Sequence, residues 1–426
     1  MKRALKWLLA AMLALVAAAA LVWALNVRDE ADVNEVKEVA LSPANSELIA
    51  RGAYLARAGN CMACHTARGG EPYAGGRAIE TPFGAVYTSN LTPDDQSGIG
   101  SWSPAHFWRA MHNGRSKDGR LLYPAFPYTS YTQVTREDSD ALFAYLRSLP
   151  AVFNPNRVHA LQFPFDSQAA LAIWRALYFK PGVYQPQAGR NAEWNRGAYL
   201  VQGLGHCSAC HAARNALGAT TAGAGLAGGL IPVQNWYAPS LASPHEAGVA
   251  DWDQQDIVSL LKNGVSKNAT VAGPMAGVVL GSTQYLTPDD LAAMAQYLKQ
   301  LPPSTTVKPH PADAVGSAAG AKLYEQHCAG CHGLQGDGVH NAYPALAGNR
   351  AVTMPQTANL VQIVLQGGYA PATQGNPRPF GMPPFVLVLS DSEIAALLTH
   401  LRQSWGNQAS GVTALDVHRI RANQGK

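Results

Sequence analysis

The pattern Cys61-Met62-Ala63-Cys64-His65 returns twice in this chain, as Cys207-Ser208-Ala209-Cys210-His211 and as Cys328-Ala329-Gly330-Cys331-His332. The spacing Cys-x-x-Cys-His is typical of c-type haem attachment. In such a site two thiols add to the vinyl groups of one haem, and the adjoining imidazole binds its iron. The repeat therefore predicts three covalently bound haem c groups. The predicted attachment residues are Cys61, Cys64, Cys207, Cys210, Cys328 and Cys331, and the predicted first iron ligands are His65, His211 and His332.

Two other uses of paired cysteines are weaker. All six cysteines of the chain lie inside the three motifs, so none remains for a disulfide. A zinc site needs four ligands, whereas each motif offers two thiols and one histidine. A thioredoxin-like pair is expected beside a βαβ pattern, and strand-like runs are scarce here. Haem attachment is the favoured interpretation.

The composition excludes some classes of function. A chain of 426 residues is too long for one ordinary core and fits about two to four domains. Its net charge of +4 is small for this length, and no run of Lys and Arg stands out beyond the N-terminus. Nucleic-acid binding therefore has no support in the sequence.

The N-terminus carries an export signal. Lys2, Arg3 and Lys6 precede an uncharged apolar run from Trp7 to Val27, an order that marks export. Val22-Trp23-Ala24 resembles a cleavage site, but the run is nearer in length to a membrane span than to a signal core. We expect residues 1–28 to be a signal peptide or membrane anchor, with the anchor favoured. The haem domains then lie on the periplasmic side of the bacterial inner membrane.

Each motif is framed by two predicted helices. A short helical pattern precedes it at residues 47–55, 194–200 and 320–324, and a longer one closes the segment at 135–149, 287–301 and 390–405. Each closing helix opens with Thr or Ser and an acidic residue three positions on, a capping-box pattern. Each leading helix contains a glycine, which costs about 1 kcal/mol relative to alanine. We expect this glycine to allow close approach of the closing helix.

These patterns divide the chain. The expected parts are the N-terminal segment 1–28, haem domains at 44–154, 190–303 and 317–406, a connecting segment at 155–189, a linker at 304–316 and a polar tail at 407–426. The connecting segment contains an aromatic amphipathic stretch at residues 171–179. This stretch is either a helix packed between domains or a contact with the membrane surface or a partner subunit.

A haem that only carries electrons generally has a second axial ligand, and methionine in this place raises the potential. Met275, in Gly273-Pro274-Met275, and Met382, in Gly381-Met382-Pro383-Pro384, are predicted ligands in loops before the closing helices. The first domain departs from this rule, because alignment places Phe126 opposite Met275 and Phe126 cannot bind iron. Met111 aligns with a core position, and His112 with a solvated one. The sixth ligand of the first haem is therefore unknown, and our hypothesis is a haem without methionine.

From residue 51 to residue 405 the chain resembles the three-haem cytochrome c subunits of bacterial membrane-bound dehydrogenases, such as those of alcohol, gluconate and fructose. The resemblance is carried by the stretches Arg51-Gly52-Ala53-Tyr54-Leu55, Tyr87-Thr88-Ser89-Asn90-Leu91-Thr92-Pro93-Asp94, Gly203-Leu204-Gly205-His206-Cys207 and Ser282-Thr283-Gln284-Tyr285-Leu286-Thr287. It implies an all-α fold of three tandem class I cytochrome c-like domains after an N-terminal signal or anchor helix. Phe126 departs from the alcohol and gluconate type and is more similar to subunits that accompany molybdenum dehydrogenases.

The resemblance also implies a function. A catalytic dehydrogenase subunit of molybdenum, flavin or quinone type would oxidise an alcohol, sugar acid or aldehyde. This chain would pass the electrons through its haems to ubiquinone or a terminal oxidase, with no substrate chemistry and no catalytic residue of its own. The alternatives are a free-standing periplasmic electron carrier and a haem enzyme or sensor that uses an open first haem.

Overall fold

The structure is a computed structural model that describes residues 2–30, 33, 46–220, 225–267, 269–304, 318–340 and 342–422. The predicted linker at 304–316 lies outside the described residues, apart from residue 304. The chain forms two compact units. The first unit holds residues 1–186, 202–206 and 216–219, and the second holds residues 187–201, 207–215 and 220–426.

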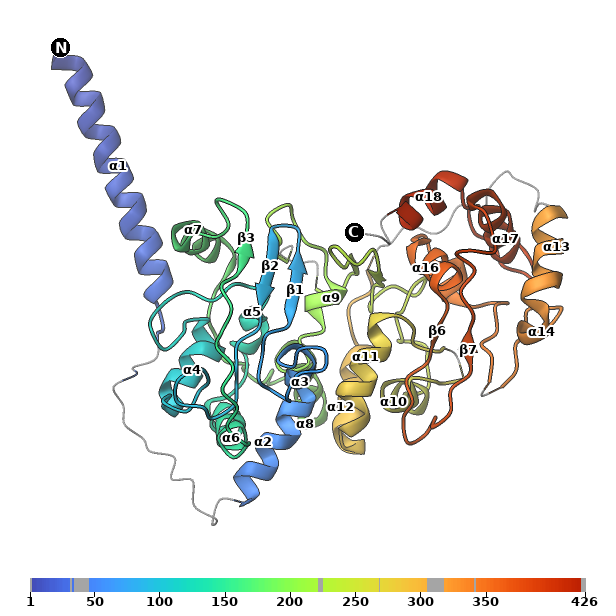
Figure 1. The fold of residues 1–426 in the computed structure, drawn as a ribbon, viewed down its shortest axis with the longest axis horizontal. Coiled ribbons are helices and arrows are strands. Elements are labelled where there is room, and N and C mark those ends of the chain that lie inside the picture. Colours follow the sequence, from blue (N-terminus) through green and yellow to red (C-terminus); the bar gives the residue numbers. More distant parts are fainter. Residues whose placement is uncertain are drawn as a thin grey trace. The chain divides into compact units, whose positions relative to one another are not determined.

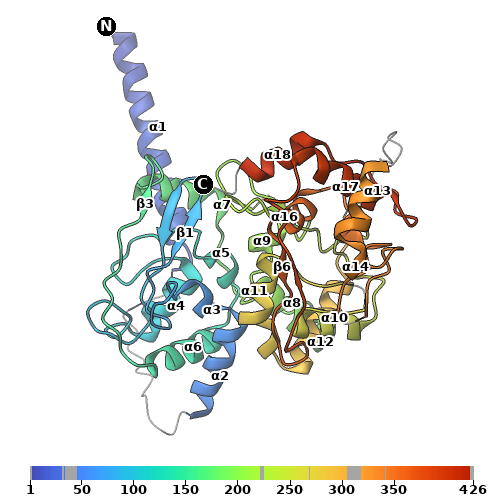
Figure 2. The same cartoon turned by 45° about the vertical axis from the view of Figure 1, so that its right-hand side comes forward.

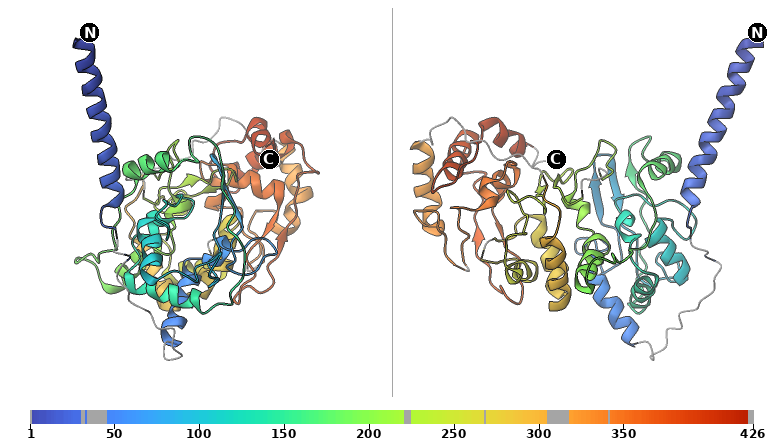
Figure 3. Two further views of the ribbon diagram at one scale, coloured as in Figure 1. Left: turned by 60° about the vertical axis from the view of Figure 1, so that its left-hand side comes forward. Right: turned by 180° about the vertical axis from the view of Figure 1, so that it is seen from behind.

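The first unit begins with α1 (Lys2–Val27), which extends away from the rest of the unit in Figures 1 and 3. By length and composition, α1 is the one helix among the described residues that could cross a membrane. The remaining helices of the unit are α2 (Ser46–Ala58), α3 (Cys61–Cys64), α4 (Pro104–Asn113), α5 (Tyr128–Tyr131), α6 (Arg136–Arg147) and α7 (Gln168–Tyr178). An antiparallel sheet in the order β1-β2-β3 joins β1 (Ala78–Thr81), β2 (Gly84–Tyr87) and β3 (Ala160–Leu161).

The second unit contains two haem-motif segments in succession. Its first half holds α8 (Ala192–Gln202), α9 (Ser208–His211), β4 (Gly229–Leu230), β5 (Tyr237–Ala238), α10 (Gln254–Asn263), α11 (Pro274–Gly281), η2 (Thr283–Tyr285) and α12 (Pro288–Lys299). Its second half holds α13 (Ala318–His327), α14 (Ala329–His332), α15 (Arg350–Thr353), α16 (Ala358–Gln366), β6 (Gly368–Tyr369), β7 (Gly381–Met382), α17 (Asp391–Gln403) and α18 (Ala414–Ala422). Figure 2 shows α13 beside α17, with α18 next to α17.

The same helix pair recurs three times: α2 with α6, α8 with α12, and α13 with α17. A Cβ on Gly52 would lie 1.9 Å from the carbonyl oxygen of Ala141, and a Cβ on Gly197 equally close to that of Ala293. At Gly320 the corresponding distance, to a carbonyl oxygen of α17, is 2.3 Å. The predicted close approach of the two helices is confirmed in all three cases.

The closing helices begin as predicted. The hydroxyls of Thr135 and Thr287 accept hydrogen bonds from the amides three residues on, and Ser390 forms a complete reciprocal capping box with Glu393. In the first two pairs the acidic residue also binds the leading helix. Arg51 donates to Asp138 at 2.6 Å, and Arg196 donates to Asp290 at 2.7 Å. The Arg-Gly dipeptide therefore supplies both the ion pair and the close contact.

Three features differ from the sequence-based expectations. The fold is mostly rather than purely helical, because short antiparallel pairs such as β1–β2 brace the loops. Met275, expected in a loop, lies in α11, which begins at Pro274 because the fixed φ of proline suits the first helical position. Beyond residue 406 the expected polar tail forms α18 instead, where Val417 is fully buried in the core of the third segment.

Candidate functional site

Each Cys-x-x-Cys-His motif occupies one helical turn, in α3, α9 and α14 with their flanking residues. Residues three positions apart share one face of a helix, so the two thiols of each motif point to the same side. None of the six cysteines forms a disulfide in the described structure. In every motif the second cysteine is exposed and the first is more deeply placed. In this arrangement one planar haem could bond to both sulfurs while the haem edge at the second cysteine stays near solvent.

The three motif histidines are held in the same way. The Nδ1 atoms of His65, His211 and His332 lie 2.8, 2.7 and 2.9 Å from the backbone carbonyl oxygens of Ser89, Pro239 and Pro344. A carbonyl only accepts, so each Nδ1 carries the proton and each Nε2 keeps its lone pair. A second-sphere hydrogen bond of this kind fixes tautomer and ring orientation in metal-ligating histidines.

Burial keeps these groups neutral. It lowers the pKa of His65, His211 and His332, an effect that the hydrogen bonds to the carbonyls partly offset. It also raises the pKa of Cys61 and Cys207 to about 12, with a smaller contribution from the second cysteine of each motif. A thiol that stays protonated is a poor redox nucleophile, which disfavours the thioredoxin-like alternative. Two thiols and an imidazole with a free Nε2 are the donor set that haem c requires.

The predicted methionine ligands lie in different local structures. Met275 is half-buried in the first turn of α11. Gly273 caps this helix, and the Trp236 ring packs on it so closely that a Cβ on Gly273 would lie 2.8 Å from the ring. Met382 lies on β7, paired with Gly368 of β6, and packs against the apolar cluster that contains Cys328. The structure thus brings Met382 to the core that holds its motif.

Phe126, which the alignment predicts at the methionine position, lies in the first unit. It is half-buried, its ring centroid lies 5.3 Å from that of Tyr131, and it packs against the same cluster as Cys61. Met111 is buried in that cluster, as the alignment predicted. The solvated position predicted for His112 is wrong: the side chain is buried, stacks on Trp108 at 4.5 Å, and its Nδ1 donates to a backbone carbonyl.

Two sets of residues near the sites were missed by the sequence analysis. Leu204 is fully buried in the core of the first unit, although it lies just before the second motif. His206 is half-buried beside Tyr131, with ring centroids 5.6 Å apart. The second set is residues 26–30, at and just after the end of α1, which contact α4 and α7 of the first unit. The pattern Gly203-Leu204-Gly205-His206 could have indicated the burial of Leu204 and His206. No local sequence pattern indicates the contacts of residues 26–30.

The fold and the donor sets define a c-type cytochrome. The sequence profile of the cytochrome c family matches residues 49–150, 195–302 and 317–405, and the chain belongs to this family. Its cofactor is covalently bound haem c, and its role is electron transport.

The chain is similar to whole subunits, and not only to single domains. It is 41% identical over 398 residues to the cytochrome c subunit of the alcohol dehydrogenase (quinone) of Gluconacetobacter polyoxogenes, which covers 89% of this chain and 85% of that protein. It is 38% identical to the gluconate 2-dehydrogenase cytochrome c subunit of Pantoea cypripedii, over 89% of this chain and 91% of that protein. It is 35% identical to the fructose dehydrogenase cytochrome subunit of Gluconobacter japonicus, over 88% of this chain and 82% of that protein. These relatives confirm the predicted family.

Proposed function

We propose that the chain carries three haem c groups in three class I cytochrome c-like domains, at residues 44–154, 190–303 and 317–406. The six motif cysteines attach them, and the three motif histidines bind their irons. Met275 and Met382 are the proposed second ligands of the second and third haems. The observation that carries this proposal is the Nδ1–carbonyl hydrogen bond, which recurs at 2.8, 2.7 and 2.9 Å.

When bound, haem c supplies an iron that takes up and releases one electron. The residues of the chain hold this centre rigid. The carbonyls of Ser89, Pro239 and Pro344 keep each imidazole from turning, and burial keeps it neutral. A methionine thioether on the other side would raise the potential. Fixed ligands minimise rearrangement between the two oxidation states, which suits electron transfer.

Polar contacts join the two haem segments of the second unit. Asn359 of α16 donates to the carbonyl of Tyr237 at 2.7 Å and accepts from its amide at 2.8 Å. Arg350 also pairs with Asp251 at 2.6 Å. Because a reciprocal side chain–backbone pair fixes rotation as well as distance, the second and third haems would keep one geometry. This supports their use in sequence by the same electron.

The chain is proposed to be the electron-transfer subunit of a membrane-bound dehydrogenase on the periplasmic side of the inner membrane. The named relatives are cytochrome c subunits of dehydrogenases, and α1 is long and apolar enough to cross a membrane. Electrons would come from a catalytic subunit of molybdenum, flavin or quinone type that oxidises an alcohol, sugar acid or aldehyde. They would leave to ubiquinone or a terminal oxidase.

Purification from native membranes tests this proposal. We expect three haems per chain by alkaline pyridine assay and a co-purifying large subunit whose cofactor reduces all of them. A chain that purifies alone with three haems would instead favour a free-standing periplasmic carrier. Two haems per chain would refute the site assignment itself.

Phe126 favours a second candidate property, an open first haem that binds small ligands or acts as a haem enzyme or sensor. Phe126 is half-buried against the cluster that contains Cys61, where the other segments are proposed to carry methionine. We expect the ferric full-length protein to show methionine-to-iron charge-transfer intensity for two haems, and Phe126→Met to raise it to three. Met111→Leu is the matched control. Intensity for three haems in the unaltered protein would contradict the proposal.

A further inference from the structure

The C-terminal end of α1 is built into the first unit. Asn26 is 9% exposed, and its side-chain amide donates to the carbonyl of Ala172 in α7 at 2.9 Å. Its Oδ1 accepts a hydrogen bond of 2.9 Å from Nε of Arg175. One side chain of the apolar helix thus satisfies two groups of α7.

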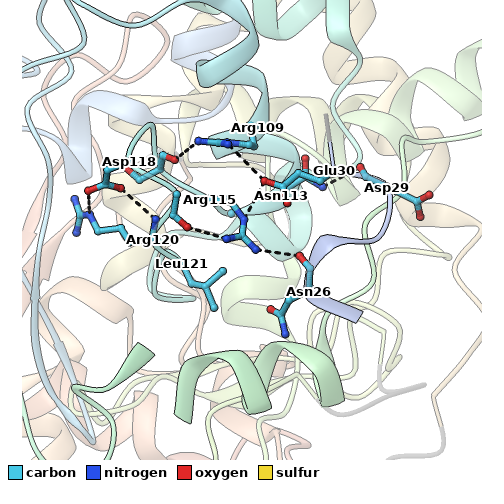
Figure 4. A network of polar contacts seen from close by, with 12 residues as sticks. Asn26, Asp29, Glu30, Arg109, Asn113, Arg115, Asp118, Arg120 and Leu121 are labelled. Atoms are coloured by element: carbon cyan, nitrogen blue, oxygen red, sulfur yellow. Dashed lines mark hydrogen bonds and ion pairs between the residues drawn. The ribbon is translucent and has the colours of Figure 1, made fainter. Parts of the chain in front are cut away.

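The residues after the helix continue the attachment (Figure 4). The Glu30 carboxylate lies 3.1 Å from Nε of Arg115 and 3.5 Å from a terminal nitrogen of Arg109. The side chain of Asn113 donates to the carbonyl of Asp29 at 3.1 Å. We call Asn26, Asp29 and Glu30 the clasp.

The clasp balances buried charge. Arg109 is 8% exposed and Arg175 is 3% exposed, and burial lowers the pKa of both guanidinium groups. Glu30 is a carboxylate that stabilises the charge of both, and Asn26 supplies an acceptor to Arg175. Removing one partner of a buried ion pair is strongly destabilising, because the remaining charge is left uncompensated. The clasp is therefore part of the fold of the first unit.

The dimensions of α1 place the clasp at a bilayer surface. Its 26 residues make a helix of about 39 Å, against about 30 Å of hydrocarbon. Trp23, which is 68% exposed, lies near the C-terminal end of this helix, where an aromatic side chain anchors a membrane span at the interface. Asn26 lies about one helical turn beyond Trp23.

The helix that the clasp binds presents an apolar face. Ile173 and Leu177, one turn apart on α7, are 53% and 64% exposed, whereas Leu171 and Arg175 on the other side are buried. Phe163, just before α7, is 85% exposed. Leu217, whose carbonyl accepts from the Trp174 indole, is 42% exposed. We call Phe163, Ile173, Leu177 and Leu217 the α7 surface.

We propose that α1 is retained in the mature protein and that the α7 surface rests in the headgroup region of the bilayer. The hydrogen bond between Asn26 and Ala172 places α7 at the level where α1 leaves the hydrocarbon. An amphipathic helix with its apolar side exposed at this depth binds lipid. The first unit then has two membrane contacts at a fixed angle, which orients its haem site relative to the bilayer. This inference rests on the proposed membrane location and not on the identity of the catalytic partner.

Intact-mass analysis of the full-length protein, extracted from membranes with detergent, tests the first part. We expect a mass that includes residues 2–27. A mature chain that begins after Ala24 would overturn the inference. Glu30→Gln should lower the melting temperature of the first unit while the mass still includes residues 2–27, and an unchanged melting temperature would refute the role of the clasp.

Reconstitution with a photoactivatable phospholipid tests the second part. We expect cross-links on residues 163–178 in addition to α1, and their loss in Ile173→Ser/Leu177→Ser with haem content unchanged. Leu387→Ser/Val388→Ser, which alters an exposed apolar pair of the second unit, is the matched control and should keep them. Cross-links confined to α1, or cross-links from α7 to a protein partner in the native complex, would overturn the lipid assignment. Haem content and co-purification, measured on the same samples, report separately on the proposed function.

Discussion

The replacement Gly197→Ala tests the helix pair that frames each haem motif. The new Cβ would lie 1.9 Å from the carbonyl oxygen and 2.5 Å from the carbonyl carbon of Ala293, where ordinary contact begins at 3.4 Å. Helix α8 would have to retreat from α12 by about 1.5 Å. Neither atom can rotate away, because both belong to helix backbone. The retreat would also strain the ion pair between Arg196 and Asp290.

The expected loss follows from two opposing terms. Overpacking in a well-packed core costs about 1–3 kcal/mol and occasionally more. Alanine recovers about 1 kcal/mol of helix propensity relative to glycine. Because the clash is with backbone, we take the upper part of the range and expect a net loss of about 2 kcal/mol. For a compact unit as large as the second one, that lowers the melting temperature by about 4–8 °C.

Thermal melting of the full-length protein, followed by circular dichroism and by the absorbance of ferrous haem, measures this loss. Gly277→Ala is the matched control, because Gly277 lies in α11 and a Cβ there would meet nothing within 4 Å. It should be neutral or stabilising by up to about 1 kcal/mol. If Gly197→Ala has the same melting temperature as the unaltered protein, the close approach of α8 and α12 does not exist in solution.

Three further predictions concern polar groups. Arg402 is fully buried, burial lowers its pKa to about 10, and it donates to the carbonyls of Val352 and Met354 at 2.6 and 2.9 Å. Arg402→Met should therefore destabilise the second unit by about 2–5 kcal/mol in denaturant titrations. Burial lowers the pKa of His112, so the folded state binds a proton less readily than the unfolded state. Neutral His112 therefore contributes its whole stabilisation above about pH 6.5, and this contribution is lost as the pH falls below that value. In His112→Gln, the melting temperature should no longer show this decrease between about pH 8 and pH 5. Asn359→Ala should cost about 1–3 kcal/mol, whereas Asp251→Asn, at a carboxylate that is 62% exposed, should cost less than about 1 kcal/mol.

Each of these has a contradicting result. If Arg402→Met unfolds at the same denaturant concentration as the unaltered protein, the buried carbonyls must accept hydrogen bonds from other donors. Identical acid-side melting of His112→Gln would place His112 in solvent. Equal effects of Asn359→Ala and Asp251→Asn would show that the reciprocal contact with Tyr237 does not join the two haem segments.

Most of the candidate site could be predicted from local sequence patterns. The motif spacing predicted which cysteines share a face, because one helical turn fixes that geometry without tertiary help. Caps at Thr135, Thr287 and Ser390 were likewise predictable, since the hydroxyl and the amide it binds are three residues apart. The glycines at 52, 197 and 320 destabilise the helices that contain them, and this predicted a close helix contact at each position. Only the structure identified the carbonyls that they face.

Alignment of one segment on another was less dependable. His112 was predicted to be solvated because it aligns with a solvated position of the second domain, but α4 is almost entirely buried in the first unit. The apparent polar tail formed α18, since Val412 and Val417 contact a core whose other residues come from distant parts of the chain. Burial depends on what packs against a face, and neighbours in sequence do not contain that information.

The sequence by itself determined the haem motifs, their number and the helices that frame them, because these depend on residues within a few turns of each other. Only the tertiary structure decided which carbonyl holds each imidazole, which in the first motif lies 24 residues away. Only the tertiary structure, likewise, joined the end of α1 to Arg175, across 149 residues. Contacts over such separations are set by how packed elements meet, and no local pattern encodes them.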